Sequence, residues 1–356
     1  MLQWADTFNR YGTDATLLLN GIYSAYSGVL APDPDPSATG NVYELVSNSS
    51  QDGLRFAYPN GAAATMGFQC LLWLSQLPIA FGSTGGFGGL GWCINDVNNA
   101  IQFYVEIGTT GALIVYRGPS PHAGTVIGQT TIPVISANSW NHIEYKYTIN
   151  STTGSVEIRV NGNAALTLTG VNNQSSALAS SAQINFINCA VNPIGVIKAS
   201  IKNLAVWDTT GTRNNTFLGL KSMTDIDTDS DVSLTWAPST GTTGYSILDN
   251  NPPLDDAAYI SAATALSNTF GLKDLPADTT SVSGIILINR SKKVDGGDGS
   301  VQMGIISGAS TGLGSNHSIT TAYTYWHDVM ETDPATGLPF TPTGFNAAKL
   351  KLDRTV

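Results

Sequence analysis

Carboxylates are the side chains of this sequence that could carry out hydrolysis. A glycoside hydrolase needs two of them flanking the scissile bond, commonly on one strand as Glu-x-Asp-x-x-Glu. The glutamates of the chain are Glu44, Glu106, Glu144, Glu157 and Glu331, and none lies in that pattern. Glu144 and Glu157 alternate with apolar residues, which predicts solvated positions on the outer faces of two strands. The sequence therefore predicts that the chain is not an enzyme, and a polysaccharide depolymerase is the least favoured alternative.

The sequence also contains no motif for nucleophilic catalysis or for a metal site of histidines or cysteines. The histidines His122, His142, His317 and His327 have no metal-ligand spacing to one another, and no Gly-x-Ser-x-Gly elbow, P-loop or dinucleotide-binding glycine motif is present. The cysteines Cys70, Cys93 and Cys189 lie far apart without a CxxC pair. An odd number of separated cysteines predicts buried thiols rather than a disulfide framework or a zinc site.

One acidic run could hold a cation. Carboxylates occupy alternate positions at Asp225, Asp227, Asp229 and Asp231. Alternate oxygens in a loop can surround Ca²⁺, as the first positions of an EF-hand do. The sixth position here is Ser230 instead of glycine and the twelfth is Trp236 instead of glutamate, so the run is not an EF-hand. Two interpretations remain, a looser calcium loop or a solvated turn, and no other cofactor is predicted.

Tryptophans could stack on sugar rings. Trp140 and Trp207 lie at strand positions and are predicted to be core residues. Trp92 follows the glycine-rich loop 82–91, and is the candidate for an exposed carbohydrate-binding platform. A long glycine-rich loop either moves or folds against a neighbouring subunit.

Composition excludes several classes of protein. The chain has 356 residues, of which 42% are hydrophobic and 12% charged, and its net charge is −10. An acidic chain repels phosphate, which argues against nucleic acid and anionic membranes as partners. The start of the chain lacks the basic and apolar regions of a signal peptide, and the apolar stretch 66–82 is too short and polar to span a bilayer. We therefore expect synthesis in the host cytoplasm and no membrane insertion.

Alternating apolar residues predict an all-β chain. In 142–149 the residues Ile143, Tyr145 and Tyr147 fall on one face, and the turn at 161–162 is Asn-Gly, a strong hairpin signal. Residues 142–169 are thus predicted to form a three-stranded antiparallel meander. We expect an antiparallel sandwich at 1–207, a connecting segment at 208–253 with little core, and a small β domain at 254–356.

The segment from Trp140-Asn-His-Ile-Glu-Tyr to Gly154-Ser-Val-Glu-Ile-Arg-Val-Asn161-Gly162 resembles the concanavalin A-like or laminin G-like jelly roll. In that family a tryptophan opens a strand and a Gly-x-Val-x-Val-x-Val-Asn-Gly hairpin follows. The resemblance covers about 25 residues and implies a fold, with little implication for function.

A wider resemblance is to structural proteins of tailed bacteriophages. It rests on segments at 8–12, 19–23, 201–219, 333–337 and 346–348, among them Phe-Asn-Arg-Tyr-Gly and Asp-Pro-Ala-Thr-Gly. The chain departs from the usual ending at Phe340, where tryptophan is usual, and at Leu350, where glycine is usual. The resemblance implies a lectin-like sandwich followed by a small β domain in a virion protein.

The sequence therefore predicts a structural subunit of a virion, tail-associated or in an appendage, that assembles with copies of itself and with other virion proteins. Low charge with many Thr, Ser and Asn residues suits wide polar contacts between copies, and closed symmetry predicts a trimer or ring. The alternatives are a carbohydrate-binding adhesin that recognises a host surface glycan, and a head-decoration protein.

Overall fold

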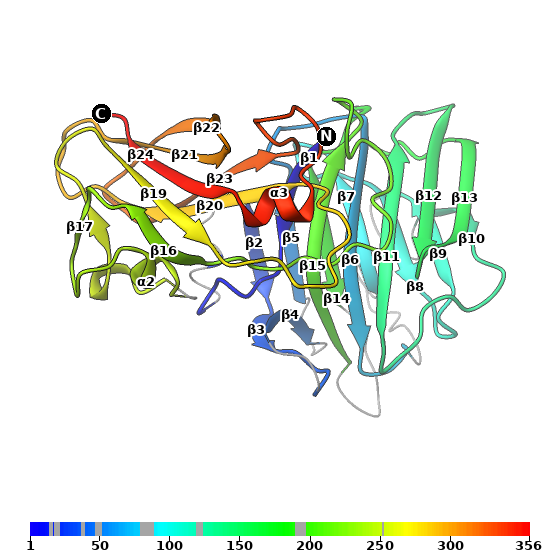
Figure 1. Ribbon diagram of the computed structural model, residues 1–356. Helices are drawn as coiled ribbons and strands as arrows, with labels where there is room; N and C mark the ends of the chain where they lie inside the picture. The colour runs from blue at the N-terminus through cyan, green and yellow to red at the C-terminus, as the bar shows by residue number, and fades with distance from the viewer. Residues whose placement is uncertain are drawn as a thin grey trace. The chain divides into compact units, whose positions relative to one another are not determined.

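The computed structural model in Figure 1 describes residues 1–13, 17, 22–36, 40–46, 52–78, 89–118, 124–188, 197–250 and 253–356. The chain forms two compact units. The first consists of Met1–Phe8 and Gly21–Met223, and the second of Asn9–Asn20 and Thr224–Val356. The segment 208–253 that was expected to connect two domains is thus divided between the units.

The first unit is a sandwich of two antiparallel sheets. The larger has eight strands in the order β13-β12-β11-β6-β15-β4-β3, with β1 also paired to β15, and the smaller has seven in the order β10-β9-β8-β7-β14-β5-β2. These strands are β1 (Leu2–Asp6), β2 (Tyr23–Ser27), β3 (Val29–Pro32), β4 (Asn41–Val46), β5 (Asp52–Ala57), β6 (Thr65–Leu74), β7 (Leu90–Asn95), β8 (Ile101–Ile107), β9 (Leu113–Arg117), β10 (Thr125–Gln129), β11 (Trp140–Thr148), β12 (Gly154–Val160), β13 (Asn163–Val171), β14 (Gln183–Asn188) and β15 (Lys198–Asp208).

Aromatic rings fill the space between the two sheets. Tyr145 of β11 lies 5.3 Å from Phe68 of β6 and 5.8 Å from Trp92 of β7, measured between ring centroids. Phe103 of β8 lies 5.3 Å from Tyr147 of β11. All five side chains are essentially buried. Because successive residues of a strand point to opposite faces, the residues that alternate with this core form the outer face of each sheet.

The second unit is a smaller β structure with its own apolar core. Its five-stranded sheet has the order β16-β19-β24-β21-β22, and two pairs of strands, β17-β18 and β20-β23, lie outside it. The core gathers Phe270, Leu287, Met303, Ile305 and Phe345. The elements are β16 (Thr228–Ser233), β17 (Ala237–Pro238), α2 (Tyr245–Leu248), η1 (Asp255–Ala257), β18 (Ile260–Ser261), β19 (Leu266–Leu272), β20 (Ile285–Ser291), β21 (Ser300–Ser307), β22 (Ser310–Ser318), β23 (Thr324–Met330), α3 (Pro342–Asn346) and β24 (Lys349–Arg354).

These findings confirm an all-β chain with an antiparallel jelly-roll sandwich followed by a smaller β unit. The meander at 142–169 is present as β11, β12 and β13, paired in sequence. Cys70 and Cys93 are buried and are not joined in a disulfide, and Cys189 lies outside the described residues. No described helix is long and apolar enough to cross a membrane.

The glycine-rich loop 295–299 separates two strands but does not form a hairpin. β20 pairs with β23, whereas β21 pairs with β22 and β24. The glycine-rich loop therefore carries the chain from one sheet to another, a connection that turn residues alone do not distinguish from a hairpin.

Candidate functional site

The outer face of the eight-stranded sheet is partly covered by residues 209–221, which we call the strap. Trp207, near the end of β15, lies flat over Gly67 of β6, where an added Cβ would be 2.3 Å from the indole ring. Phe217 of the strap packs against Trp207 with ring centroids 6.5 Å apart. The guanidinium group of Arg159 on β12 lies 3.9 Å from the centre of the Phe217 ring. Aromatic stacking and a cation–π contact thus hold the strap to the sheet.

The strap also buries the carboxylate of Glu144. The backbone N–H of Gly219 donates a hydrogen bond to Glu144 Oε1 at 2.7 Å, and Glu144 is only 1% exposed. The prediction that Glu144 is solvated is therefore wrong, because a segment 75 residues later in the chain covers it. Glu157, the other predicted solvated carboxylate, is partly exposed and pairs with Arg159 at 2.9 Å.

His142 lies two residues before Glu144 on the same outer face. It is 6% exposed, and neither ring nitrogen has a hydrogen-bond partner among the described residues. Burial lowers the pKa of His142, while the nearby Glu144 carboxylate opposes that shift. The imidazole is therefore neutral at neutral pH.

Two tryptophans lie side by side elsewhere on the outer face. Trp140 of β11 stands directly opposite Trp73 of β6 in the register, and both are half-buried. Lys202 of β15 places its ammonium group 4.2 Å from the centre of the Trp140 ring and forms an ion pair with Asp33. Adjacent indoles with polar neighbours can stack on a sugar ring and hydrogen-bond its hydroxyls. The prediction that Trp140 is a core residue is wrong, and alternation with Ile143 and Tyr145 already indicated an outward side chain.

Trp92, the predicted platform, is a core residue that is 1% exposed. It belongs to β7, in which Leu90, Trp92 and Ile94 alternate toward the sandwich interior. Its ring packs edge to face against Phe68 at 5.9 Å. Trp92 therefore cannot offer an exposed surface to a sugar. Most of the loop 82–91 lies outside the described residues.

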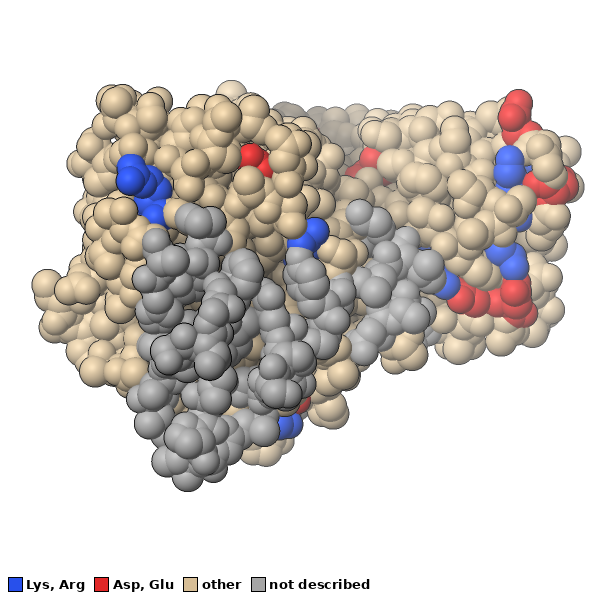
Figure 2. Space-filling model, turned by 180° about the vertical axis from the view of Figure 1, so that it is seen from behind, with Lys and Arg blue, Asp and Glu red and all other residues tan. Residues whose placement is uncertain are grey.

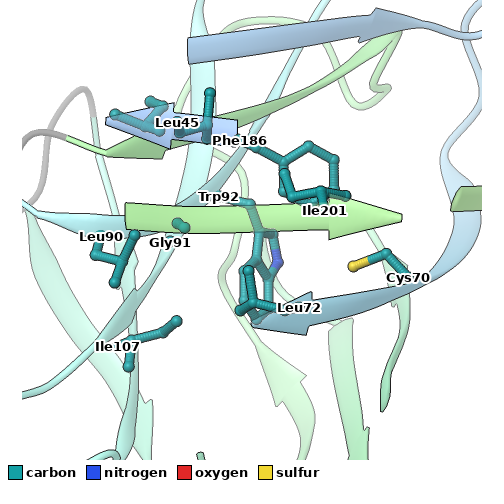
Figure 3. A pocket seen from close by; sticks show the side chains of 11 residues that line it. Leu45, Cys70, Leu72, Leu90, Gly91, Trp92, Ile107, Phe186 and Ile201 are labelled. Atoms are coloured by element: carbon teal, nitrogen blue, oxygen red, sulfur yellow. The ribbon is translucent and has the colours of Figure 1, made fainter. Parts of the chain in front are cut away.

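Trp92 also lines a small cavity between the sheets (Figure 3). The cavity has a volume of about 10 Å³, close to the space that one water molecule needs. Its walls are apolar, and include Leu45, Cys70, Leu72 and Ile107. A gap of this size and lining is imperfect packing in the core and offers no site for a ligand.

The four aspartates of the proposed calcium loop do not form a ligand set. Asp225 accepts a hydrogen bond from Asn9 at 2.9 Å, and Asp227 pairs with Lys273 at 3.1 Å. Asp231 accepts bonds from two backbone N–H groups, at residues 244 and 245. Among the described residues, no group of three or more His, Cys, Asp or Glu side chains could hold a metal ion. The calcium interpretation is therefore not supported, because Asp225, Asp227 and Asp231 are each held by a different partner.

The seven-stranded sheet carries a row of largely buried side chains on the face that points away from the sandwich interior. Five strands contribute one residue each in register, namely Arg55, Asn185, Cys93, Tyr104 and Tyr116. Arg55 Nε donates a hydrogen bond to Asn185 Oδ1 at 3.1 Å. Burial raises the pKa of Tyr116 far above its usual range, and the adjacent Glu106 carboxylate adds to the shift. Cys93, Tyr104, Tyr116 and Asn185 are all buried, so the row is packing on this face of the sheet and offers no accessible surface to a ligand.

In the second unit, one histidine is held by a carboxylate. His317 Nε2 lies 3.0 Å from Asp328 Oδ2, and the His317 ring stacks on Trp326 with centroids 5.1 Å apart. A catalytic histidine would also contact a nucleophile. No hydroxyl or thiol is hydrogen-bonded to His317 in the part of the chain that the structure describes, so the pair is read as a structural contact between β22 and β23.

Comparisons with known proteins identify no family. No protein-family model matches the chain, and no curated protein matches it. Among solved structures, the chain is similar to alginate lyase Aly36B at 10% identity and a TM-score of 0.38, over 57% of this chain and 96% of that one. It is also similar to the Emp46p carbohydrate recognition domain at 8% identity and 0.38, over 58% and 96%. Domain 4 of AbnA, an arabinanase from Geobacillus stearothermophilus, gives 13% and 0.36, over 58% and 91%.

Proposed function

We propose that the chain is a non-enzymatic structural subunit of a tailed-phage virion, located in the tail or an appendage. It assembles through symmetric contacts with copies of itself and with other virion proteins. The observation that carries the proposal is the contact between the Glu144 carboxylate and the strap. This buried carboxylate fixes the strap through the Gly219 N–H group at 2.7 Å instead of facing a cleft.

The other acidic groups of the sheet support the same proposal. Glu157 is paired with Arg159, and Glu44 with Lys198 at 3.0 Å. A hydrolase needs two carboxylates that face each other about 5–10 Å apart across a groove. Side chains that hold strands and the strap in place are instead what a passive building block requires.

Mass spectrometry and a density map of purified particles test this proposal. We expect the chain in the particle as several symmetry-related copies, on the tail rather than the head. A position on the capsid surface would replace the tail assignment by head decoration. Absence from the particle, or turnover of a bacterial surface polysaccharide by the purified protein, would refute the proposal.

A second candidate function is carbohydrate binding, as in an adhesin that contacts a host surface glycan. The adjacent Trp73 and Trp140 favour it, with Lys202 over the Trp140 ring. A sugar ring stacked on an aromatic side chain contributes on the order of 1 kcal/mol to the binding free energy. Isothermal titration with purified host polysaccharide, comparing the wild type with Trp140→Ala, tests the idea. We expect binding to weaken about tenfold, whereas Val126→Ala, on the other sheet, should bind normally.

A further inference from the structure

We propose that β13 is the contact edge for a second copy of this chain, so that the two eight-stranded sheets join edge to edge. β13 spans Asn163–Val171, a nine-residue strand at the end of its sheet. In Figure 1 it is drawn at the margin of the first unit. This inference rests on the proposed self-assembly and names the surface that carries it.

The composition of β13 leaves this edge without the usual protections. Its sequence, NAALTLTGV, contains no charged residue and no proline. Natural sheets protect exposed edges with short strands, charges or proline, because unpaired backbone groups invite another strand. β3, at the opposite end of the sheet, has four residues and ends at Pro32. β16, an edge strand in the second unit, carries Asp229 and Asp231. β13 lacks all of these protections.

The backbone of β13 is paired on one side. Every ladder contact of the strand is to β12, from Val160 opposite Asn163 to Gly154 opposite Val171. Among the described residues, no backbone hydrogen bond from 163–171 reaches another segment. Half of the strand's N–H and C=O groups therefore point away from the sheet, which is the arrangement that strand addition uses.

Two leucines lie along this edge. Leu166 and Leu168 point toward the sandwich interior opposite Ile158 and Val156, yet both remain partly exposed. Leu168 also lies against Gly128 of β10. A second copy would remove the exposed parts of both leucines from water.

The edge is complementary to itself. A twofold axis at Thr167 would place Leu166 opposite Leu168 of the second copy, and the reverse pair equally, in an antiparallel ladder. The nearest charges, Glu157 and Arg159 on β12, already pair with each other at 2.9 Å. Two copies would therefore meet without like-charge repulsion, which favours self-association over a charged peptide as the occupant.

Analytical ultracentrifugation of the full chain tests the proposal with matched variants. Thr167→Lys places two ammonium groups at the predicted axis, and should weaken self-association at least about tenfold. Thr153→Lys, an exposed threonine in the turn before β12, is the control and should associate as the wild type does. Circular dichroism and thermal unfolding establish that each variant is folded.

Cross-linking gives a second readout that does not depend on a loss of function. Residues opposite each other in an antiparallel ladder have Cα atoms about 4.5–5.5 Å apart, which a disulfide can span. Thr167→Cys should therefore oxidise to a covalent dimer, and Thr153→Cys should not. Wild-type association that Thr167→Lys does not weaken, with no disulfide-linked dimer of Thr167→Cys, would overturn the β13 assignment while leaving self-assembly intact. A wild type that stays monomeric at high concentration would overturn both.

Discussion

At the residue scale, Trp207 packs closely over Gly67 on the outer face of the larger sheet. A Cβ at Gly67 would lie 2.3–2.6 Å from three atoms of the indole ring, and Trp207 is fully buried. Gly67→Ala should therefore displace the ring and lower the free energy of unfolding by about 1–3 kcal/mol. Denaturant unfolding followed by tryptophan fluorescence measures this. Gly296→Ala, where a Cβ meets nothing within 4 Å, should leave stability unchanged, and equal effects of the two variants would contradict the assignment.

His327 makes the second unit sensitive to acid. Burial lowers the pKa of His327 to about 4, with Asp328 opposing the shift and His317 adding to it. An unfolded histidine titrates near 6.5. Between about 6.5 and about 4 the unfolded chain thus binds more protons, and the free energy of unfolding falls as the pH falls. Because the side chain is partly exposed, we expect a loss of about 1–2 kcal/mol. Urea unfolding at several pH values should show a flatter profile for His327→Gln, and identical profiles would refute the explanation.

Single residues also show what the sequence could reveal about the site. Alternation fixes the side of a strand on which a residue lies, so the outward position of Trp140 and the inward position of Trp92 were both predictable from their neighbours. The burial of Glu144 was not. It depends on a contact with Gly219, 75 positions away, and local periodicity carries no information about such contacts.

At the element scale, the strap is a segment without regular structure that the side chains of strands hold in place. Phe217 is its anchor, between Arg159 at 3.9 Å and the Trp207 ring. Phe217→Ala removes a cation–π contact and a ring contact, together worth about 1–2 kcal/mol. Trypsin cleavage at Arg213 and Lys221, both in the strap, should accelerate about tenfold because local opening becomes more frequent.

A matched control for the strap is Thr209→Ala, which changes an exposed residue at the start of the same segment. Its cleavage rate should equal that of the wild type. If Phe217→Ala also leaves the rate unchanged, the strap is held by Glu144 and the backbone rather than by the aromatic ring.

Strand pairing can be predicted from the sequence where the paired strands are close along the chain, and not where they are far apart. The meander β11-β12-β13 was predictable because Asn161 and Gly162 form its turn, with Asn161 at φ 52° and Gly162 at φ 80°. Asn161 Oδ1 additionally accepts a hydrogen bond from the His142 N–H group at 2.8 Å. Pairings such as β15 with β6, or β14 with β7, join residues roughly 90 to 140 positions apart, and nothing in either strand specifies its partner.

At the scale of the whole molecule, the path of the chain between units is the least predictable feature. Residues 9–20 belong to the second unit, where Arg10 pairs with Asp225 at 3.6 Å and Tyr11 packs on Tyr325 at 5.4 Å. A short N-terminal segment that returns to a late part of the chain leaves no compositional mark. The expected division at 207 and 254 followed changes in composition, whereas compact packing divides the chain after Met223.

The low charge of the molecule predicts that its self-association depends little on salt. Charged residues are 12% of the chain, and Figure 2 shows that most of the drawn surface is neither acidic nor basic. An association through the uncharged edge strand β13, with Leu166 and Leu168, depends on apolar burial and backbone hydrogen bonds, which salt does not screen. The dissociation constant of the wild type should therefore change less than about twofold between low salt and 0.5 M salt. Sedimentation equilibrium at the two ionic strengths measures it. Association that weakens tenfold or more in high salt would instead assign the contact to charged groups such as those on β16, and would argue against the β13 edge.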